Sequence, residues 1–313
     1  MKTQVLKTKR KLTFKEIKKS LLSNWDLYLL ILPVVIYYII FHYIPMYGVQ
    51  IAFKNFSVRL GITGSPWAGL KYFKRFFDSY YFGRLIINTV SISAYSIVAG
   101  FFCPILLALM LNEVRNFRFK RIVQTVTYAP YFLSTVVMVG LIVNLFGING
   151  LINNVREFLN IERLDFMVKP KYFRSLYVWS GVWQNTGWGS IIYLAALSAI
   201  DPELHEAARI DGAGRFRRIW HINIPGIMPT MTILLILSVG GIMNVGFEKI
   251  FLMQNDINLE RSDVISTYVY RVGLLGADYS FSAAIGLFNS VINFIILIIV
   301  NSIAKKISDS SLF

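Results

Sequence analysis

The chain has 313 residues, of which 55% are hydrophobic and 16% charged, and its formal net charge is +15. Because a soluble domain carries about 25% charged residues, this composition predicts a membrane protein and excludes a disordered chain. The single cysteine, Cys103, excludes a disulfide scaffold. In a membrane protein, Lys and Arg concentrate in the cytoplasmic loops, and this explains the positive charge without a nucleic-acid partner.

The N-terminal segment, residues 1–26, is rich in Lys and Arg interleaved with apolar residues. It either forms a basic helix on anionic lipid headgroups or remains a solvated run of charge, and the sequence favours neither. A cleaved signal peptide is disfavoured, because the apolar stretch that follows has no small-residue cleavage site after it.

Six stretches are apolar and long enough to cross about 30 Å of hydrocarbon as helices. They lie at approximately 27–47, 85–111, 122–146, 177–199, 227–250 and 282–303. We therefore predict an all-α membrane protein, with a six-helix transmembrane domain over 27–303 and a short tail at 304–313. Lys and Arg are about twice as dense on the side that holds both termini, which predicts that both ends are cytoplasmic.

Motifs for catalysis and cofactor binding are missing from the sequence. There is no P-loop to hold a nucleotide, and the three histidines are too scattered to form a metal site. No nucleophile motif is recognisable either. We therefore predict no enzyme, no catalytic or metal-binding residues, and no cofactor on this chain.

The loop between the fourth and fifth stretches carries the most specific pattern. Asp201 is a good N-cap before Pro202, and Gly212 provides a stop, so a helix over 202–211 is predicted. A second short helix, 215–222, is expected to end before Pro225, because proline disrupts a continuing helix.

This loop resembles the EAA loop of the membrane subunits of ABC importers. The resemblance rests on Glu206-Ala207-Ala208, then Gly212, then Ile222-x-Ile224-Pro225, with Ile where Leu is commoner. The extension Asp211-Gly212-Ala213 resembles the carbohydrate-uptake branch of that family.

Two earlier stretches strengthen the resemblance and extend it over nearly the whole chain. They are Tyr43-Ile44-Pro45-Met46-Tyr47-Gly48 with Ala52-Phe53-Lys54, and Gly69-Leu70-x-Tyr72-Phe73 with Asn88-Thr89. Both are similar to the permeases of bacterial oligo- and polysaccharide importers, the group of LplB-like and alginate-type permeases.

The resemblance implies a type I ABC importer (MetI-like) permease fold in the bacterial plasma membrane. It implies four kinds of partner: a second homologous permease, two cytoplasmic ATPase subunits that hold ATP-Mg, an extracellular lipoprotein or periplasmic binding protein, and the lipid bilayer. The loop would be a coupling helix seated in a cleft of the ATPase, with Glu206, Ala207, Ala208, Asp211, Gly212 and Pro225 as its functional residues. The alternative is that Glu206 only pairs with Arg209 on a surface helix.

Polar residues within the stretches are candidates for the substrate pathway, because they are costly in a membrane unless they face a cavity or a neighbouring helix. In related maltose-type permeases the helices beside the coupling loop contact sugar. This points to Gln184, Asn185, Trp188, Ser238 and Asn244. The alternative is that they hydrogen-bond between packed helices.

The fifth stretch also contains glycines and Pro229, which favour a thin, kinked helix or close packing. At its end, Glu248 and Lys249 either mark the outer end of the span or place charge inside the membrane.

Other functions remain open at this stage. A permease of the same fold could serve glycerol phosphate or an amino acid, and an ion channel or secondary transporter would also fit six spans. The basic outer loops favour either an acidic glycan or an acidic binding protein.

Overall fold

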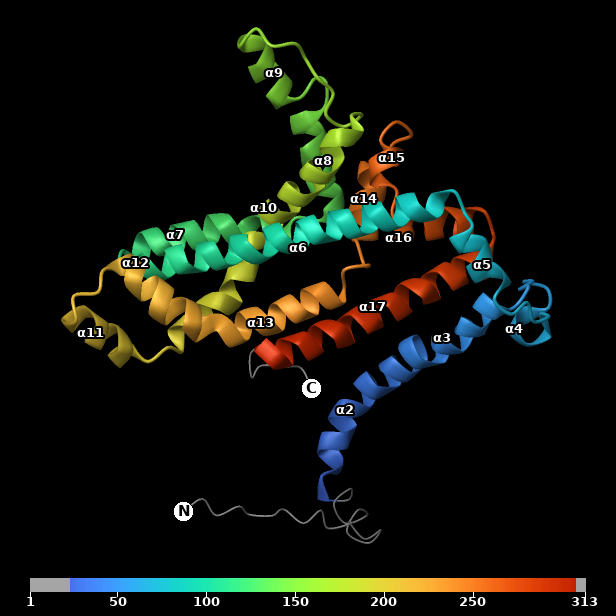
Figure 1. Ribbon diagram of the computed structural model, residues 1–313, viewed down its shortest axis with the longest axis horizontal. Helices are drawn as coiled ribbons and strands as arrows, with labels where there is room; N and C mark the ends of the chain where they lie inside the picture. The colour runs from blue at the N-terminus through green and yellow to red at the C-terminus, as the bar shows by residue number, and fades with distance from the viewer. Residues whose placement is uncertain (1–22, 308–313) are drawn as a thin grey trace.

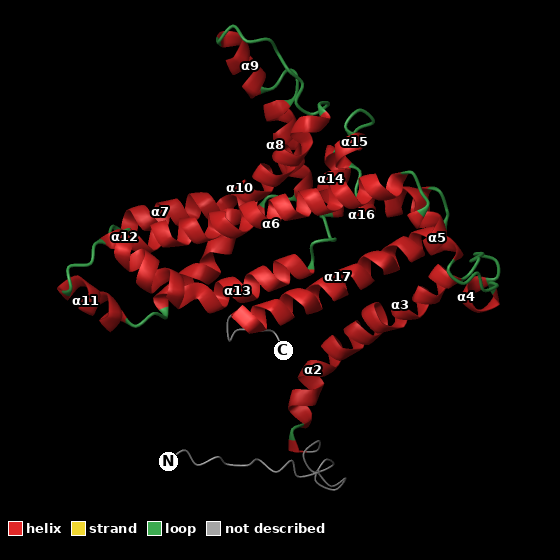
Figure 2. Cartoon of the chain, in the orientation of Figure 1, coloured by secondary structure: helices red, strands yellow, loops and turns green. Residues whose placement is uncertain are grey.

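The computed structural model describes residues 23–307, and this part of the chain is helical apart from one isolated β-bridge between Lys54 and Trp67. The basic residues 1–22 and the end of the tail, 308–313, lie outside the described residues. Figure 2 shows helices joined by short loops.

The α-helices are, in chain order, α2 (Trp25–Tyr38), α3 (Ile44–Met46), α4 (Gly61–Gly64), α5 (Lys71–Phe77), α6 (Tyr81–Glu113), α7 (Phe117–Tyr128), α8 (Thr135–Phe146), α9 (Leu151–Phe158), α10 (Pro170–Ser198), α11 (Pro202–Ile210), α12 (Arg215–Arg218), α13 (Ile224–Gly240), α14 (Phe247–Met253), α15 (Leu259–Ser262), α16 (Ile265–Val269) and α17 (Tyr279–Ile307). Short 3₁₀ segments occur at Tyr47–Phe53 and Ala129–Phe132, and π segments at Ile39–Tyr43, Ile219–Asn223 and Tyr270–Leu275.

Five helical stretches among the described residues are long and apolar enough to cross a membrane. They are Trp25–Phe53, Tyr81–Glu113, Thr135–Phe158, Arg215–Gly240 and Tyr279–Lys306. The predicted fourth span, 177–199, lies within α10 and its C-cap Ala199; α10 has 29 residues but is not among these five. The prediction of six spans therefore stays a prediction.

Two of the predicted spans are not continuous helices. The third, 122–146, is interrupted at residues 133–134, between the 3₁₀ segment and α8. The fifth, 227–250, ends as a helix at Gly240 and resumes only at Phe247. Breaks of this kind free backbone groups, and other helices satisfy two of them here: Gln184 Nε2 donates to the Leu133 carbonyl at 3.0 Å, and the Met243 N–H donates to Asn293 Oδ1 at 3.0 Å.

The prediction that a helix ends before Pro225 is wrong. The helix runs without a break from Arg215 to Gly240, through the π segment Ile219–Asn223. In this segment the N–H of Ile224 donates to the Ile219 carbonyl, five residues back. The wider turn shifts the hydrogen-bond register just before the proline, so the missing N–H and the bulky ring of Pro225 are accommodated.

The same device precedes Pro45. There the N–H of Ile44 donates to the Ile39 carbonyl across the π segment Ile39–Tyr43, and the helix continues to Phe53. Pro229 lies inside α13 without ending it, and this helix ends at Gly240.

The packing centres on α6 and α10, which cross one another and contact α7, α13 and the α15–α16 region (Figure 1). Glycine permits the closest approach. A Cβ on Gly187 of α10 would lie 2.0 Å from the Thr127 carbonyl oxygen of α7, and a Cβ on Gly240 would lie 2.5 Å from Leu297 of α17. At one end of this arrangement α11 projects outward, whereas α4 and α5 lie at the opposite end.

Candidate functional site

The α11 helix has the caps that the sequence predicts. The side chain of Asp201 accepts a hydrogen bond from the N–H of Glu203 at 2.9 Å, and Pro202 occupies the first turn. At the other end the N–H of Ala213 donates to the Ala208 carbonyl at 2.8 Å, and that of Gly212 to the Arg209 carbonyl at 3.1 Å. Together these bonds form a Schellman motif.

Gly212 is required by this turn. Its φ is +74°, a conformation that residues with a Cβ rarely adopt. The turn reverses the chain from α11 into α12, where Arg215 pairs with Glu113 at the end of α6 at 3.2 Å. The motif therefore attaches α11 to the helix bundle at a defined angle.

The surface of α11 is open to solvent. None of its residues is buried, and the large apolar side chains Ile210 and Phe216 near its end are 87% and 86% exposed. Glu206, Ala207, Asp211 and Gly212 are exposed as well, and Ala208 is half-buried. Within residues 23–307, Glu206 forms no ion pair, so the alternative pairing with Arg209 is not seen there.

A cavity of about 380 Å³ lies between α6, α10 and α14. Gln184 and Asn185 line it, as predicted pathway residues would, and Ser238 lines an adjoining cavity of about 350 Å³. The two cavities share Ser96, Gly100, Pro104 and Gly189 as lining residues. Three of the five pathway candidates therefore line two neighbouring cavities.

The other two pathway candidates pack against helices. Trp188 stacks on Tyr131 with ring centroids 4.5 Å apart. Asn244 accepts hydrogen bonds from the side-chain amides of Asn289 and Asn293 at 3.0 and 3.1 Å. The contacts of Trp188 and Asn244 fit the alternative role, in which these side chains hold packed helices together.

Lys249 is the functional candidate that sequence reasoning left undecided. It is half-buried and lines the 380 Å³ cavity together with Gln184 and Asn185. The sequence shows a lysine near the end of an apolar stretch. Its position beside α10 depends on the break in the helix after Gly240, which the sequence does not reveal.

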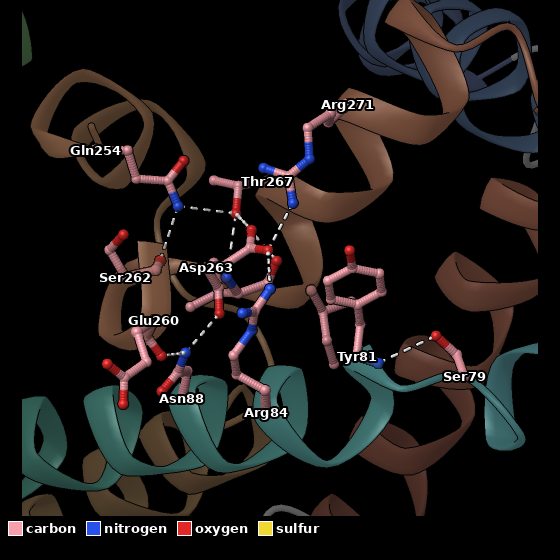
Figure 3. A network of polar contacts seen from close by, with 12 residues as sticks. Ser79, Tyr81, Arg84, Asn88, Gln254, Glu260, Ser262, Asp263, Thr267 and Arg271 are labelled. Carbon is pink, nitrogen blue, oxygen red and sulfur yellow. Dashed lines mark hydrogen bonds and ion pairs between the residues drawn. The ribbon is translucent and has the colours of Figure 1, made fainter. Parts of the chain in front are cut away.

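A second polar cluster, which we name the Asp263 network, consists of Arg84, Asn88, Asp263, Thr267 and Arg271. Asp263 has no exposed surface and pairs with Arg271 at 2.5 Å and with Arg84 at 3.6 Å. Thr267 donates to it at 3.0 Å, and Asn88 donates to the backbone carbonyls of Asp263 and Glu260 at 2.9 and 3.0 Å. Figure 3 shows both arginines pointing at the carboxylate from different helices.

The Asp263 network fastens the segment after α14 to α6. It lies near the beginning of α6, whereas Arg215 of α12 pairs with Glu113 at the end of that helix. Nothing in the sequence pattern pointed to Asp263, because a single acid between polar residues looks like any loop residue. Its role depends on the contact between two segments that are distant in sequence, α6 and residues 260–271.

Comparison with known proteins identifies the family. The model of the binding-protein-dependent transport system inner membrane component matches residues 100–309. The chain belongs to this family. It is therefore an ABC importer permease, a transport subunit of the membrane and not an enzyme.

Two relatives in Bacillus subtilis (strain 168) cover almost the whole chain. Protein LplB is 44% identical over 93% of this chain and 92% of its own length. The polygalacturonan/rhamnogalacturonan transport system permease protein YteP is 42% identical over 94% of this chain and 92% of its own.

A solved structure agrees with the fold of this permease. It is a chain of a bacterial ABC transporter involved in the import of the acidic polysaccharide alginate, with a TM-score of 0.87 and 40% identity. The match covers 93% of this permease and 99% of that chain. A second structure shows bacterial alginate ABC transporter in complex with a periplasmic protein bound to an alginate pentasaccharide, and it matches with a TM-score of 0.87 and 39% identity.

Proposed function

We propose that this permease forms, together with a second homologous permease, the transmembrane pathway for an oligosaccharide or polysaccharide-derived substrate. The support for a glycan comes from relatives of 40–44% identity, one named for polygalacturonan and rhamnogalacturonan and one for alginate. The observation that carries the proposal is the pair of neighbouring cavities along α10, the helix that leads to α11: Gln184 and Asn185 line the first, and Ser238 lines the second.

Delivery and energy come from partner proteins in this proposal. An extracellular lipoprotein or periplasmic binding protein brings the glycan, and two cytoplasmic subunits bind ATP-Mg and hydrolyse ATP. Six helices cross the membrane, with α10 as the additional crossing, and both termini lie in the cytoplasm. Residues 1–26 then lie at the inner membrane surface, 27–303 form the permease domain and 304–313 form a cytoplasmic tail.

The α11 helix is the coupling helix in this proposal. Its exposed face fits a cleft of the ATPase: Ala207 and Ala208 keep the contact surface thin, and Glu206 has no partner ion among the described residues and is free to meet a basic one. Because α12, the π segment and α13 form one unbroken helix, a displacement of α11 is transmitted directly into a membrane-crossing helix. Pro225 lies within that connection, and Asp211 and Gly212 fix its angle to α11.

Movement of this connected helix relative to α6 and α10 would open the cavities to one side of the membrane at a time. Different contacts in the two states would then bias one equilibrium, which is the requirement for alternating access.

The test uses the complete importer, purified through a tag on this permease and reconstituted with its partners. We expect Glu206→Arg or Gly212→Pro to release the ATPase or to abolish the stimulation of ATP hydrolysis by loaded binding protein. Glu157→Ala on α9, an exposed acid remote from α11 in Figure 1, is the matched control and should behave as wild type. A wild-type chain that purifies without any ATPase would contradict the proposal.

A further inference from the structure

Lys249 occupies an unusual place for a cation. Its ammonium donates a hydrogen bond to the backbone carbonyl of Tyr177 at 3.0 Å and lies 4.8 Å from the centre of the Tyr177 ring. It lies so close to α10 that a Cβ on Gly181 would come within 3.3 Å of Nζ. The lysine thus reaches from α14 into the wall of the 380 Å³ cavity.

No carboxylate compensates this charge in the part of the chain that the structure describes. The described residues that line the cavity include no Asp or Glu, and Lys249 takes part in none of the ion pairs among residues 23–307. By contrast, Arg84 and Arg271 both face a carboxylate, that of Asp263, at 3.6 and 2.5 Å. An ammonium has three donors, and residues 23–307 provide one hydrogen-bond acceptor for that of Lys249.

The groups around Lys249 complement a sugar acid. Gln184 and Asn185, which line the cavity, use their amide N–H groups to bond the carbonyls of Leu133 and Gly181, and this leaves their amide oxygens available as acceptors. Amide oxygens accept hydrogen bonds from sugar hydroxyls, and an ammonium binds a carboxylate. A volume of about 380 Å³ also lies within the usual range of small-molecule sites, roughly 300–1,000 Å³.

We propose that Lys249 binds the carboxylate of a uronic acid unit as the glycan passes through this cavity, so that the permease selects acidic oligosaccharides. This inference rests on the proposed importer function. A cation without a protein counter-ion is costly in a poorly hydrated site, and a negatively charged substrate repays that cost only while it is bound. Neutral oligosaccharides would leave the charge uncompensated.

The test compares a charged probe, trigalacturonate, with its neutral trimethyl ester, which has the same sugar units. Uptake of each is measured in proteoliposomes holding the complete importer, with wild type, Lys249→Met and Lys249→Arg. We expect Lys249→Met to lower the uptake of trigalacturonate at least tenfold and that of the ester at most twofold, and Lys249→Arg to remain within about threefold of wild type for both. The same binding protein loads both probes for every variant, so the ratio of the two rates cancels differences in delivery.

A matched control separates local binding from general electrostatic attraction. Lys74→Met removes the same charge from an exposed site on α5 and should leave the ratio unchanged. Equilibrium dialysis of trigalacturonate against the permease and ATPase complex, without binding protein, should show reduced binding for Lys249→Met only.

Three results would overturn the inference. Equal losses for both probes would assign Lys249 a structural role or a carboxylate partner on the second permease, and unchanged uptake of both would place it outside the pathway. A wild-type importer that takes up neutral oligosaccharides but not trigalacturonate would refute the acidic specificity while leaving the importer function intact. Failure of the proposed function itself would appear differently, as a wild-type chain without an ATPase.

Discussion

The Asp263 network and the Lys249 cavity differ in whether the charged side chain has a counter-ion among the described residues. In the network a fully buried carboxylate is surrounded by two arginines and a threonine, and its own backbone is bonded by Asn88. In the cavity a lysine has one carbonyl and one ring as partners within the described chain. The comparison teaches that charge already satisfied by the fold holds segments together, whereas charge left open is available to a ligand.

Removal of the buried carboxylate should have the largest effect on stability. Asp263→Ala leaves Arg84 and Arg271 without a counter-ion, and breaking a buried ion pair costs about 3–5 kcal/mol. We expect a lower thermal midpoint of the purified permease complex and reduced yield from membranes, measured by thermal unfolding in detergent. Asp256→Ala, an exposed acid in the same segment, is the control and should be neutral.

The thermal midpoint also tests the Lys249 cavity. Lys249→Met, which replaces an unpaired cation with an apolar chain of similar length, should leave the thermal midpoint unchanged or raise it slightly. If Lys249→Met destabilises the complex as strongly as Asp263→Ala, the distinction between the two regions fails.

Removal of Asn88 should have an intermediate effect. Its amide N–H groups bond two carbonyls, and its amide oxygen accepts from Arg174 at 2.9 Å. Asn88→Ala therefore leaves buried polar groups unpaired, at a cost of about 1–3 kcal/mol. Chemical or thermal unfolding should show this loss, and Asn154→Ala, at an exposed position, should not.

A methyl group added beside Lys249 should have the smallest effect on transport. Gly181→Ala places a Cβ 3.3 Å from Nζ, and the flexible lysine can move aside. We expect stability to be unchanged and the uptake of trigalacturonate to fall about two- to threefold, a cost below 1 kcal/mol. Uptake of the trimethyl ester should not change, and a fall in both probes would show that the substitution distorts α10 itself.

Local chemistry made the α11 region predictable. Asp201 and Pro202 define the beginning of the helix, and Gly212 adopts the positive φ that its Schellman turn requires. These signals act over a few residues, so the sequence is enough to read them. The expectation at Pro225 failed because a π segment, which leaves no simple sequence signature, shifted the hydrogen-bond register before the ring.

The pathway candidates were only partly predictable, because a polar residue in an apolar stretch has two possible partners. Gln184 and Asn185 face a cavity, whereas Asn244 bonds Asn289 and Asn293. The sequence shows the same amide in each case, and the direction in which it points depends on the neighbouring helix.

The sequence by itself determined the membrane class, the apolar stretches, the caps of α11 and the family of this permease. These follow from composition, from hydrophobic length and from hydrogen bonds between near neighbours. Only the tertiary structure decided where helices break, which amides face a cavity, and that Asp263 is paired while Lys249 is not. The physical reason is that the cost of a buried charge or a free backbone group depends on partners that can be distant in sequence, and no local pattern reveals them. Arg84 and Arg271, for example, lie on different helices and meet only at Asp263.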